Sequence, residues 1–181
     1  MKFQFNINVN EQDYLDYNNF MVIRSHYGKK HMFIYRISIA IIIAGFIMVV
    51  LISDELSLES IISVIPMVIL LALCQVFLKK FLEWSLKTHI KTQKKKGRMP
   101  FSSEAVMEFY EDSFVETTTY SKTENKYTMI ERISVVDNKM IYIHVNNVMS
   151  YMLPLSSFMS KEQYDSFFDF IKTKCPNIDI Y

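Results

Sequence analysis

The sequence predicts an α+β membrane protein: a two-helix transmembrane hairpin joined to a cytoplasmic antiparallel β-sheet that a C-terminal helix covers. Three observations predict this class. Two long uncharged apolar runs lie in the first half of the chain, and basic residues flank both runs while acidic residues separate them. The C-terminal part then changes to the two-residue alternation that is typical of strands. The net charge of the 181 residues is only +1, so the position of the charges is more informative than their sum.

Residues 1–30 are predicted to form a strand followed by a capped helix. Apolar and polar residues alternate from Phe3 to Asn10, which indicates a half-buried strand. Asn10 has the character of an N-cap, with acidic residues in the turn that follows, so a helix is expected from about Glu11 towards Tyr27. A single strand is not stable alone. It should therefore pair with a sheet in the C-terminal third, so that this segment packs with the cytoplasmic domain.

A transmembrane hairpin is predicted over residues 32–82, with spans at about 32–52 and 61–82. A bilayer core needs about 20 mostly apolar helical residues. Ile37 to Ile52 and Ile61 to Leu78 contain no charged residue. A pair of buried core helices is the weaker alternative, because neither run has the polar stripe of a helix on a soluble core. A cleavable signal peptide also fits poorly, since the first run begins after 36 residues and no small-residue cleavage site follows it.

The distribution of charge orients this hairpin. Arg24 to Arg36 contains four Lys and Arg residues and no acid, and Lys79 to Arg98 contains eight and one acid. Ser53 to Ser60, between the two runs, contains three acids and no basic residue. Short loops rich in Lys and Arg stay in the cytoplasm. Both termini are therefore expected in the cytoplasm and the acidic loop outside.

Residues 83–100 are predicted to be a basic helical connector that continues the second span until Gly97 ends it. Nucleic-acid binding would need interleaved aromatic residues or a known module, and neither is present, so no nucleic-acid partner is predicted. The basic cluster is expected to fix the topology, to contact anionic lipid at about 1 kcal/mol per charge, or both. The residues predicted for this role are Lys79, Lys80, Lys87, Lys91, Lys94, Lys95, Lys96 and Arg98.

Residues 101–181 are predicted to form the cytoplasmic sheet-plus-helix domain, as an antiparallel meander. The turns are expected at "EDS", "TEN", "DN" and "NN", which are rich in Asp and Asn. Ser160 and Gln163 form a capping box for a final helix whose apolar stripe should cover one face of the sheet. The candidate strands are Ala105–Tyr110, Phe114–Tyr120, Tyr127–Val136, Met140–Val145 and Val148–Pro154.

The sequence contains none of the spacings that are typical of the phosphate-binding, nucleophilic or metal-binding motifs of enzymes. The three glycines exclude a glycine-rich phosphate loop, a dinucleotide fingerprint and a nucleophile elbow. The four histidines are scattered and neither cysteine lies near one, so no metal site, cofactor or catalytic residue is predicted. A membrane-associated enzyme is the second alternative function, and it would need a pocket that joins His144 to the acidic cluster between Glu108 and Glu116.

Three stretches carry a family resemblance: "FYEDSFVE" from Phe109, "YTMIERISVVDNKMIYIHV" from Tyr127, and "YMLPLSSFMSKEQYDSFFDFI" from Tyr151. With the order of the elements, they resemble the YcxB-like family of small bacterial membrane proteins. The resemblance implies a PH-like C-terminal domain and a bacterial inner-membrane location, and it supplies no catalytic residues. Leu155 stands where the family usually has a basic residue, so no role is assigned to that position.

The expected function is that of a non-enzymatic bacterial membrane protein whose cytoplasmic PH-like domain binds a partner. That partner would be a protein, a lipid or a second copy of the chain. The first alternative is a bacteriocin immunity or membrane-stress protection protein, because some membrane proteins with PH-like domains look like self-protection factors.

Overall fold

The computed structural model describes residues 1–52, 58–97, 101–146 and 149–181. The chain divides into two compact units. The sheet unit comprises Met1–Tyr14 together with Pro100–Tyr181, and the helical unit comprises Leu15–Met99. The helical unit is therefore an insertion within the sequence of the sheet unit.

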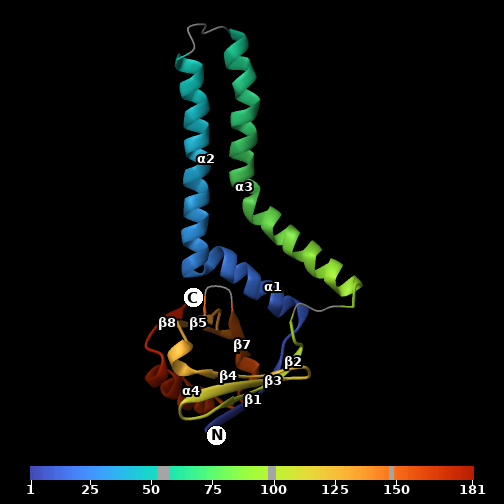
Figure 1. The fold of residues 1–181 in the computed structure, drawn as a ribbon, viewed down its shortest axis with the longest axis vertical. Helices are drawn as coiled ribbons and strands as arrows, with labels where there is room; N and C mark the ends of the chain where they lie inside the picture. The colour runs from blue at the N-terminus through green and yellow to red at the C-terminus, as the bar shows by residue number, and fades with distance from the viewer. Residues whose placement is uncertain (53–57, 98–100, 147–148) are drawn as a thin grey trace. The chain divides into compact units, whose positions relative to one another are not determined.

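The first sheet of the sheet unit joins the N-terminal strand to the C-terminal part of the chain (Figure 1). Its strands lie in the order β1-β2-β3-β4, and every neighbouring pair is antiparallel. Phe5 and Ile7 of β1 are buried while Asn6 between them is exposed, which confirms the predicted strand. Its partner β2 lies in the predicted domain of residues 101–181, just before the C-terminal third in which the partner was expected. The strands are β1 (Phe3–Asn8), β2 (Glu104–Phe109), β3 (Ser113–Thr118) and β4 (Lys122–Lys126).

The second sheet has the order β7-β6-β5-β8, and its β5–β8 pair is parallel. The predicted "DN" turn joins β5 to β6: Asp137 and Asn138 have φ of 52° and 48°, a left-handed backbone that Asp and Asn tolerate. The strands are β5 (Arg132–Val136), β6 (Met140–His144), β7 (Ser150–Pro154) and β8 (Ile178–Ile180).

The prediction of one meander is wrong in three places. The predicted strand Tyr127–Val136 is broken, because a 3₁₀ turn at Tyr127–Met129 carries the chain from one sheet to the other. The Tyr127 hydroxyl donates to the Tyr110 carbonyl oxygen at 2.9 Å, a long-range contact that holds this turn. The expected "TEN" turn lies inside β4, and the turn falls at residues 119–121, where Thr118 Oγ1 accepts hydrogen bonds from two backbone amides. β8 was not predicted.

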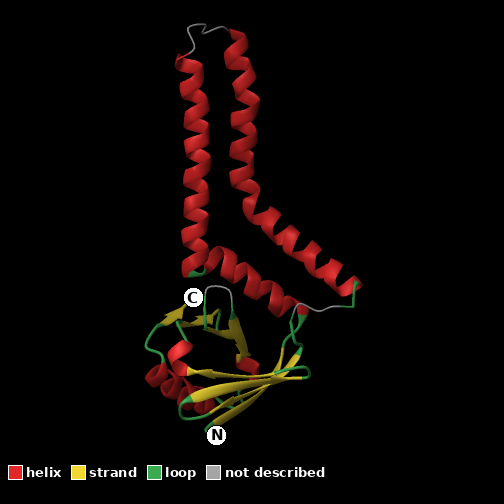
Figure 2. Cartoon of the chain, viewed as in Figure 1, coloured by secondary structure: helices red, strands yellow, loops and turns green. Residues whose placement is uncertain are grey.

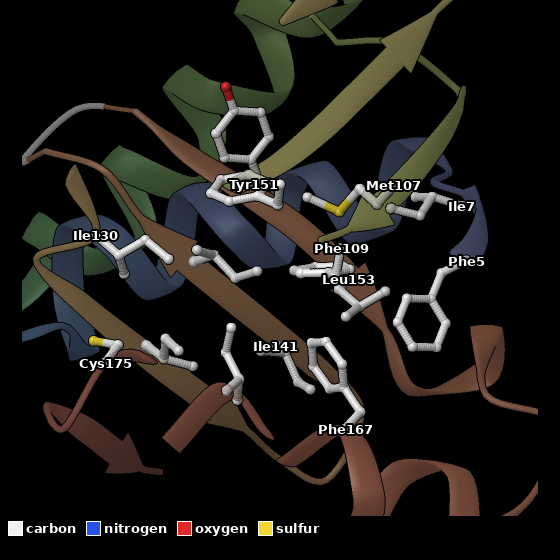
Figure 3. Close-up of a cluster of buried hydrophobic side chains, with 14 of the residues drawn as sticks. Phe5, Ile7, Met107, Phe109, Ile130, Ile141, Tyr151, Leu153, Phe167 and Cys175 are labelled. Atoms are coloured by element: carbon white, nitrogen blue, oxygen red, sulfur yellow. The ribbon is translucent and has the colours of Figure 1, made fainter. Parts of the chain in front are cut away.

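A helix and both sheets contribute to the core of the sheet unit (Figure 3). Phe167 of α4 (Lys161–Lys174) is fully buried, with its ring centroid 4.8 Å from that of Phe109 and 5.1 Å from that of Phe5. Ile141 and Leu153 of the second sheet belong to the same cluster. Because edge-to-face aromatic pairs add to the energy of burial, this cluster ties β1 to α4.

Both predicted helix caps of the sheet unit are observed. Asn10 Oδ1 accepts hydrogen bonds from the amides of Gln12 and Asp13 at 2.8 and 3.0 Å. Asp13 Oδ2 in turn accepts a hydrogen bond from the Asn10 amide at 3.1 Å. At α4, Ser160 Oγ accepts from the Gln163 amide at 3.2 Å. These bonds satisfy amides that have no partner within the first helical turn.

The helical unit contains two long helices, and Figure 2 shows them side by side over part of their length. The helix predicted towards Tyr27 ends earlier: α1 (Glu11–Asn19) and a π-helical turn (Phe20–Arg24) stop at Ser25, whose backbone is extended. Ser25 Oγ accepts from the Gly28 amide at 2.9 Å and so caps α2 (His26–Ile52). A Cβ on Gly28 would lie 2.5 Å from the Met21 carbonyl oxygen, so this close approach needs glycine.

α2 is the helix that, among the described residues, is long and apolar enough to cross a membrane, over His26–Val49. The second predicted span lies within α3 (Leu58–Lys95) and is helical. Side chains at the beginning of α3, at residues 58–61, 63, 64 and 67, lie outside the described part of the chain. One candidate span is found among the described residues, where the sequence predicts two. α3 ends where expected, before Gly97 with φ of 67°.

Candidate functional sites

The first candidate site is the outward apolar surface of α2. Of its most apolar 18-residue window, 6% is buried. Phe33, Ile41 and Met48 are each more than half exposed. Monomeric soluble proteins rarely expose an apolar surface of this extent, because removing apolar area from water stabilises by about 25 cal/mol per Å². The surface therefore fits an apolar environment better than water.

The same kind of surface continues on one side of α3. With about 100° between successive residues, Val76, Phe77 and Trp84 lie on one side of the helix, and all three are exposed. Leu86 and Ile90, which are half-buried and buried, lie about 130° and 90° around the helix from the middle of this group. This side of α3 therefore exposes large apolar and aromatic residues, which a helix on a soluble core would normally bury.

The structure places most of the predicted basic residues on α3. Four of them, Lys80, Lys87, Lys91 and Lys94, fall within an arc of about 60° on the side of Trp84. Lys79 lies about 100° from Lys80 around the helix. Arg98 lies outside the described residues. The lysines that are described and exposed are Lys79, Lys80, Lys87, Lys91, Lys94, Lys95 and Lys96.

The second candidate site is a polar cluster on the second sheet that centres on His144. The ring contacts two hydroxyls: Nδ1 lies 2.6 Å from Ser150 Oγ, and Nε2 lies 3.0 Å from Ser134 Oγ. His144 and Ser134 are buried, on the face of the sheet opposite to Ile133 and Ile143, which belong to the core. Strand pairing brings the three polar side chains together, because each strand contributes one of them.

Burial and charge hold this histidine neutral. Desolvation lowers the pKa of His144 to about 4, and the positive charge of Arg132 acts in the same direction. Arg132 Nη1 is itself 2.9 Å from Asp179 Oδ2. A neutral imidazole between two hydroxyls accepts one hydrogen bond and donates one, so both ring nitrogens are satisfied. These hydrogen bonds stabilise the sheet. Ser134 is 1% exposed, so a substrate cannot reach its hydroxyl.

A membrane-associated enzyme would require His144 and the acidic cluster between Glu108 and Glu116 to share a pocket. The structure places them apart. Glu108 pairs with Val115 on the face of the first sheet away from the core, whereas His144 lies on the second sheet. Glu116 lies on the same side of β3 as buried Phe114, and its burial raises the pKa of its carboxyl. These side chains therefore do not share one pocket.

Glu111 of the acidic cluster has a structural role. Its carboxylate forms ion pairs with Lys2 at 2.5 Å and Lys174 at 3.0 Å. Hydrogen bonds from Lys2 and then Lys174 lower the pKa of Glu111. The ammonium of Lys2 lies 5.2 Å from the Phe170 ring centroid, so this network joins the start of β1 to α4. Across residues 1–52, 58–97, 101–146 and 149–181, no three His, Cys, Asp or Glu side chains are grouped to hold a metal.

Comparison with known proteins identifies one segment of the sheet unit. The family model described as YcxB-like protein matches residues 109–171. No curated protein and no solved structure matches the chain. The matched segment runs from the last residue of β2 to Ile171 in α4 and includes β3 to β7. β1 and the inserted helical unit lie outside it. Residues 109–171 therefore form a YcxB-like domain.

Proposed function

We propose that the chain is a non-enzymatic integral protein of the bacterial inner membrane. In this proposal α2 and α3 cross the bilayer as a hairpin and hold the sheet unit in the cytoplasm, where its PH-like domain binds a protein or lipid partner. The observation that carries the proposal is the exposure of the apolar residues of α2. Only 6% of its most apolar 18-residue window is buried. A bilayer is the environment in which such a surface is stable.

The pairing of β1 with β2 supports a second crossing. Asn8 pairs with Glu104, so the chain leaves the sheet unit and returns to the neighbouring strand. If α2 crosses the bilayer once, the chain has to cross again before β2. α3 follows α2 directly and its 38 residues span about 57 Å, ample for a bilayer core of about 30 Å. The pairing of β1 with β2 therefore supports the second span, which the apolar composition of residues 61–82 also predicts.

The same pairing argues against a cleaved signal sequence. Cleavage after α2 would separate β1 from the sheet unit, and with it two core residues, Phe5 and Ile7. Full burial of such side chains stabilises by about 1.5–3 kcal/mol each. Retention of the N-terminus is therefore part of the proposal.

The orientation follows from the basic flanks. Four basic residues precede the first apolar run and eight follow the second, between Lys79 and Arg98, whereas the residues between the two runs include three acids. Basic flanks stay on the cytoplasmic side. The two sheets and α4 are compatible with a PH-like domain whose exposed surface is available to a partner.

Alkaline carbonate extraction tests this proposal with the full chain. Membranes from expressing cells are washed at high pH, which releases peripheral proteins and retains integral ones. The intact chain, with Met1 detected by mass spectrometry, should remain in the pellet. Release of the chain, or recovery of a fragment that begins after α2, would contradict the proposal.

A further inference from the structure

We propose that the basic end of α3, from Lys80 to Lys95, is a binding site for anionic lipid headgroups of the bilayer that α3 crosses. This inference rests on the proposed membrane insertion and names the ligand of one surface. It makes α3 a membrane span that continues into an interfacial segment.

The order of side chains along one side of the helix carries the inference. Val76 is 74% exposed, Phe77 is 50% exposed and Trp84 is 63% exposed, and all three lie on the side that later carries lysines. Tryptophan is enriched where the hydrocarbon meets the headgroups, because its ring is apolar and its N–H is polar. Lys87 and Lys91 follow on the same side. Lys80 precedes Trp84 on this side, at a level where the stem of a lysine can extend its ammonium to the headgroups. The surface thus changes from apolar residues, through a stretch that contains both a lysine and a tryptophan, to further lysines, in the order of the layers of a bilayer.

The charges of this surface complement an anionic headgroup layer. Between Lys80 and Lys95 there are five lysines and one acid, Glu83. The four lysines of the arc are exposed, whereas Leu86 and Ile90, about 110° and 70° around the helix from its middle, are half-buried and buried. A cluster of this size just inside a span attracts anionic lipid.

The path of α3 keeps the lysines within reach of the headgroups. Lys94 follows Trp84 by about 15 Å along a straight helix, which exceeds the screening length of about 8 Å at physiological salt. Figure 1 shows that α3 changes direction between the part beside α2 and its basic end. This bend tilts the basic end, so its lysines lie closer to the membrane plane than a straight continuation would place them.

Trp84 provides the probe, because it is the one tryptophan of the chain. The full-length protein is placed in nanodiscs that contain equal fractions of an anionic and a zwitterionic lipid, with bromine on the acyl chains of one or the other. Bromine quenches a nearby tryptophan, so the two preparations report which lipid surrounds Trp84. The inference predicts about a fivefold enrichment of anionic lipid beside Trp84, which corresponds to about 1 kcal/mol. Higher salt should reduce it.

Two variants with equal charge changes make the test specific. K87Q/K91Q/K94Q should abolish the preference for anionic lipid, whereas K122Q/K126Q/K161Q, in the sheet unit, should retain it. Equal quenching by both lipids in the wild type, or a preference that survives in the first variant, would overturn the lipid site while leaving the membrane anchor intact. Absence of quenching by either lipid would instead overturn the membrane insertion itself.

Discussion

The two units contain the same kinds of apolar side chain but treat them in opposite ways. Phe167 and Ile141 of the sheet unit are 0% and 1% exposed, whereas Phe33 and Ile41 of α2 are 64% and 65% exposed. The sheet unit removes its apolar residues from water by packing them against each other. In the helical unit, α2 leaves most of its apolar side chains on its surface. The comparison shows that one short chain contains one segment that folds around its own core and one that exposes a long apolar helix, which the proposed function places in a bilayer.

The largest expected effect comes from opening the core of the sheet unit. Phe167→Ala should lower the free energy of unfolding by about 3–5 kcal/mol, because it leaves a cavity among tightly packed aromatic rings. Pulse proteolysis in urea, with the protein in mild detergent, measures this loss. Phe168→Ala is the matched control on the same helix, since Phe168 is only half-buried. Equal losses in the two variants would contradict the assignment of the core.

A charge on α2 should act almost as strongly, although the residue that it replaces is exposed. Ile41→Lys should disfavour membrane insertion by about 2.5–3.5 kcal/mol, the cost of lysine near the centre of a bilayer. Tyr120→Lys, at a position 94% exposed in the sheet unit, should change nothing. The fraction of each chain that resists carbonate extraction is the measurement. Two variants that behave alike would show that α2 meets water.

The histidine cluster should make the stability of the sheet unit depend on pH. The pKa of His144 is lowered to about 4, below its ordinary value of 6.5, so the unfolded chain binds a proton more readily than the folded one. The contribution of neutral His144 to the free energy of unfolding is therefore fully present above about pH 6.5 and is lost as the pH drops towards 4. The expected loss at pH 5 is roughly 2 kcal/mol relative to pH 7.5. Thermal unfolding at both pH values measures it, and a His144→Asn variant that keeps the full dependence would contradict this assignment.

The smallest effect concerns the start of α4. Ser160→Ala removes the hydroxyl that accepts from the Gln163 amide and should cost about 1 kcal/mol of unfolding free energy. Ser166→Ala, at an exposed position in the middle of the same helix, should cost nothing, because alanine is the better helix former. The urea midpoints of the two variants provide the comparison. A Ser160 variant as stable as wild type would remove the cap from the account.

Local features were the most predictable part of this fold. The caps at Asn10 and Ser160 and the end of α3 at Gly97 each depend on residues within a few positions of one another, and all three are observed. The division into two sheets was not predicted, because the break at Tyr127 depends on a contact with Tyr110, 17 positions earlier. β8 has three residues, too few to show an alternating pattern.

The two candidate sites differ in the same way. Four of the lysines of α3 could be assigned to one side of a helix from their spacing, because helical geometry alone determines that side. The contacts of His144 with Ser134 and Ser150 require the registers of β5, β6 and β7, which pair Arg132 with His144 and His144 with Ser150. Alternation would have placed Ser134 and Arg132 on one face of β5, but not opposite His144.

The most direct test of the central claim is the side of the membrane on which each flank of the insertion lies. Single cysteines at Asn6, Ser57 and Ser102 are introduced into a chain with Cys74→Ala, in which Cys175 stays buried and unreactive. A maleimide that cannot cross membranes is then applied to spheroplasts. The account predicts labelling of Ser57→Cys in intact spheroplasts and of Asn6→Cys and Ser102→Cys only after lysis. Labelling of Asn6→Cys and Ser102→Cys from opposite sides, or of all three from one side, would contradict it.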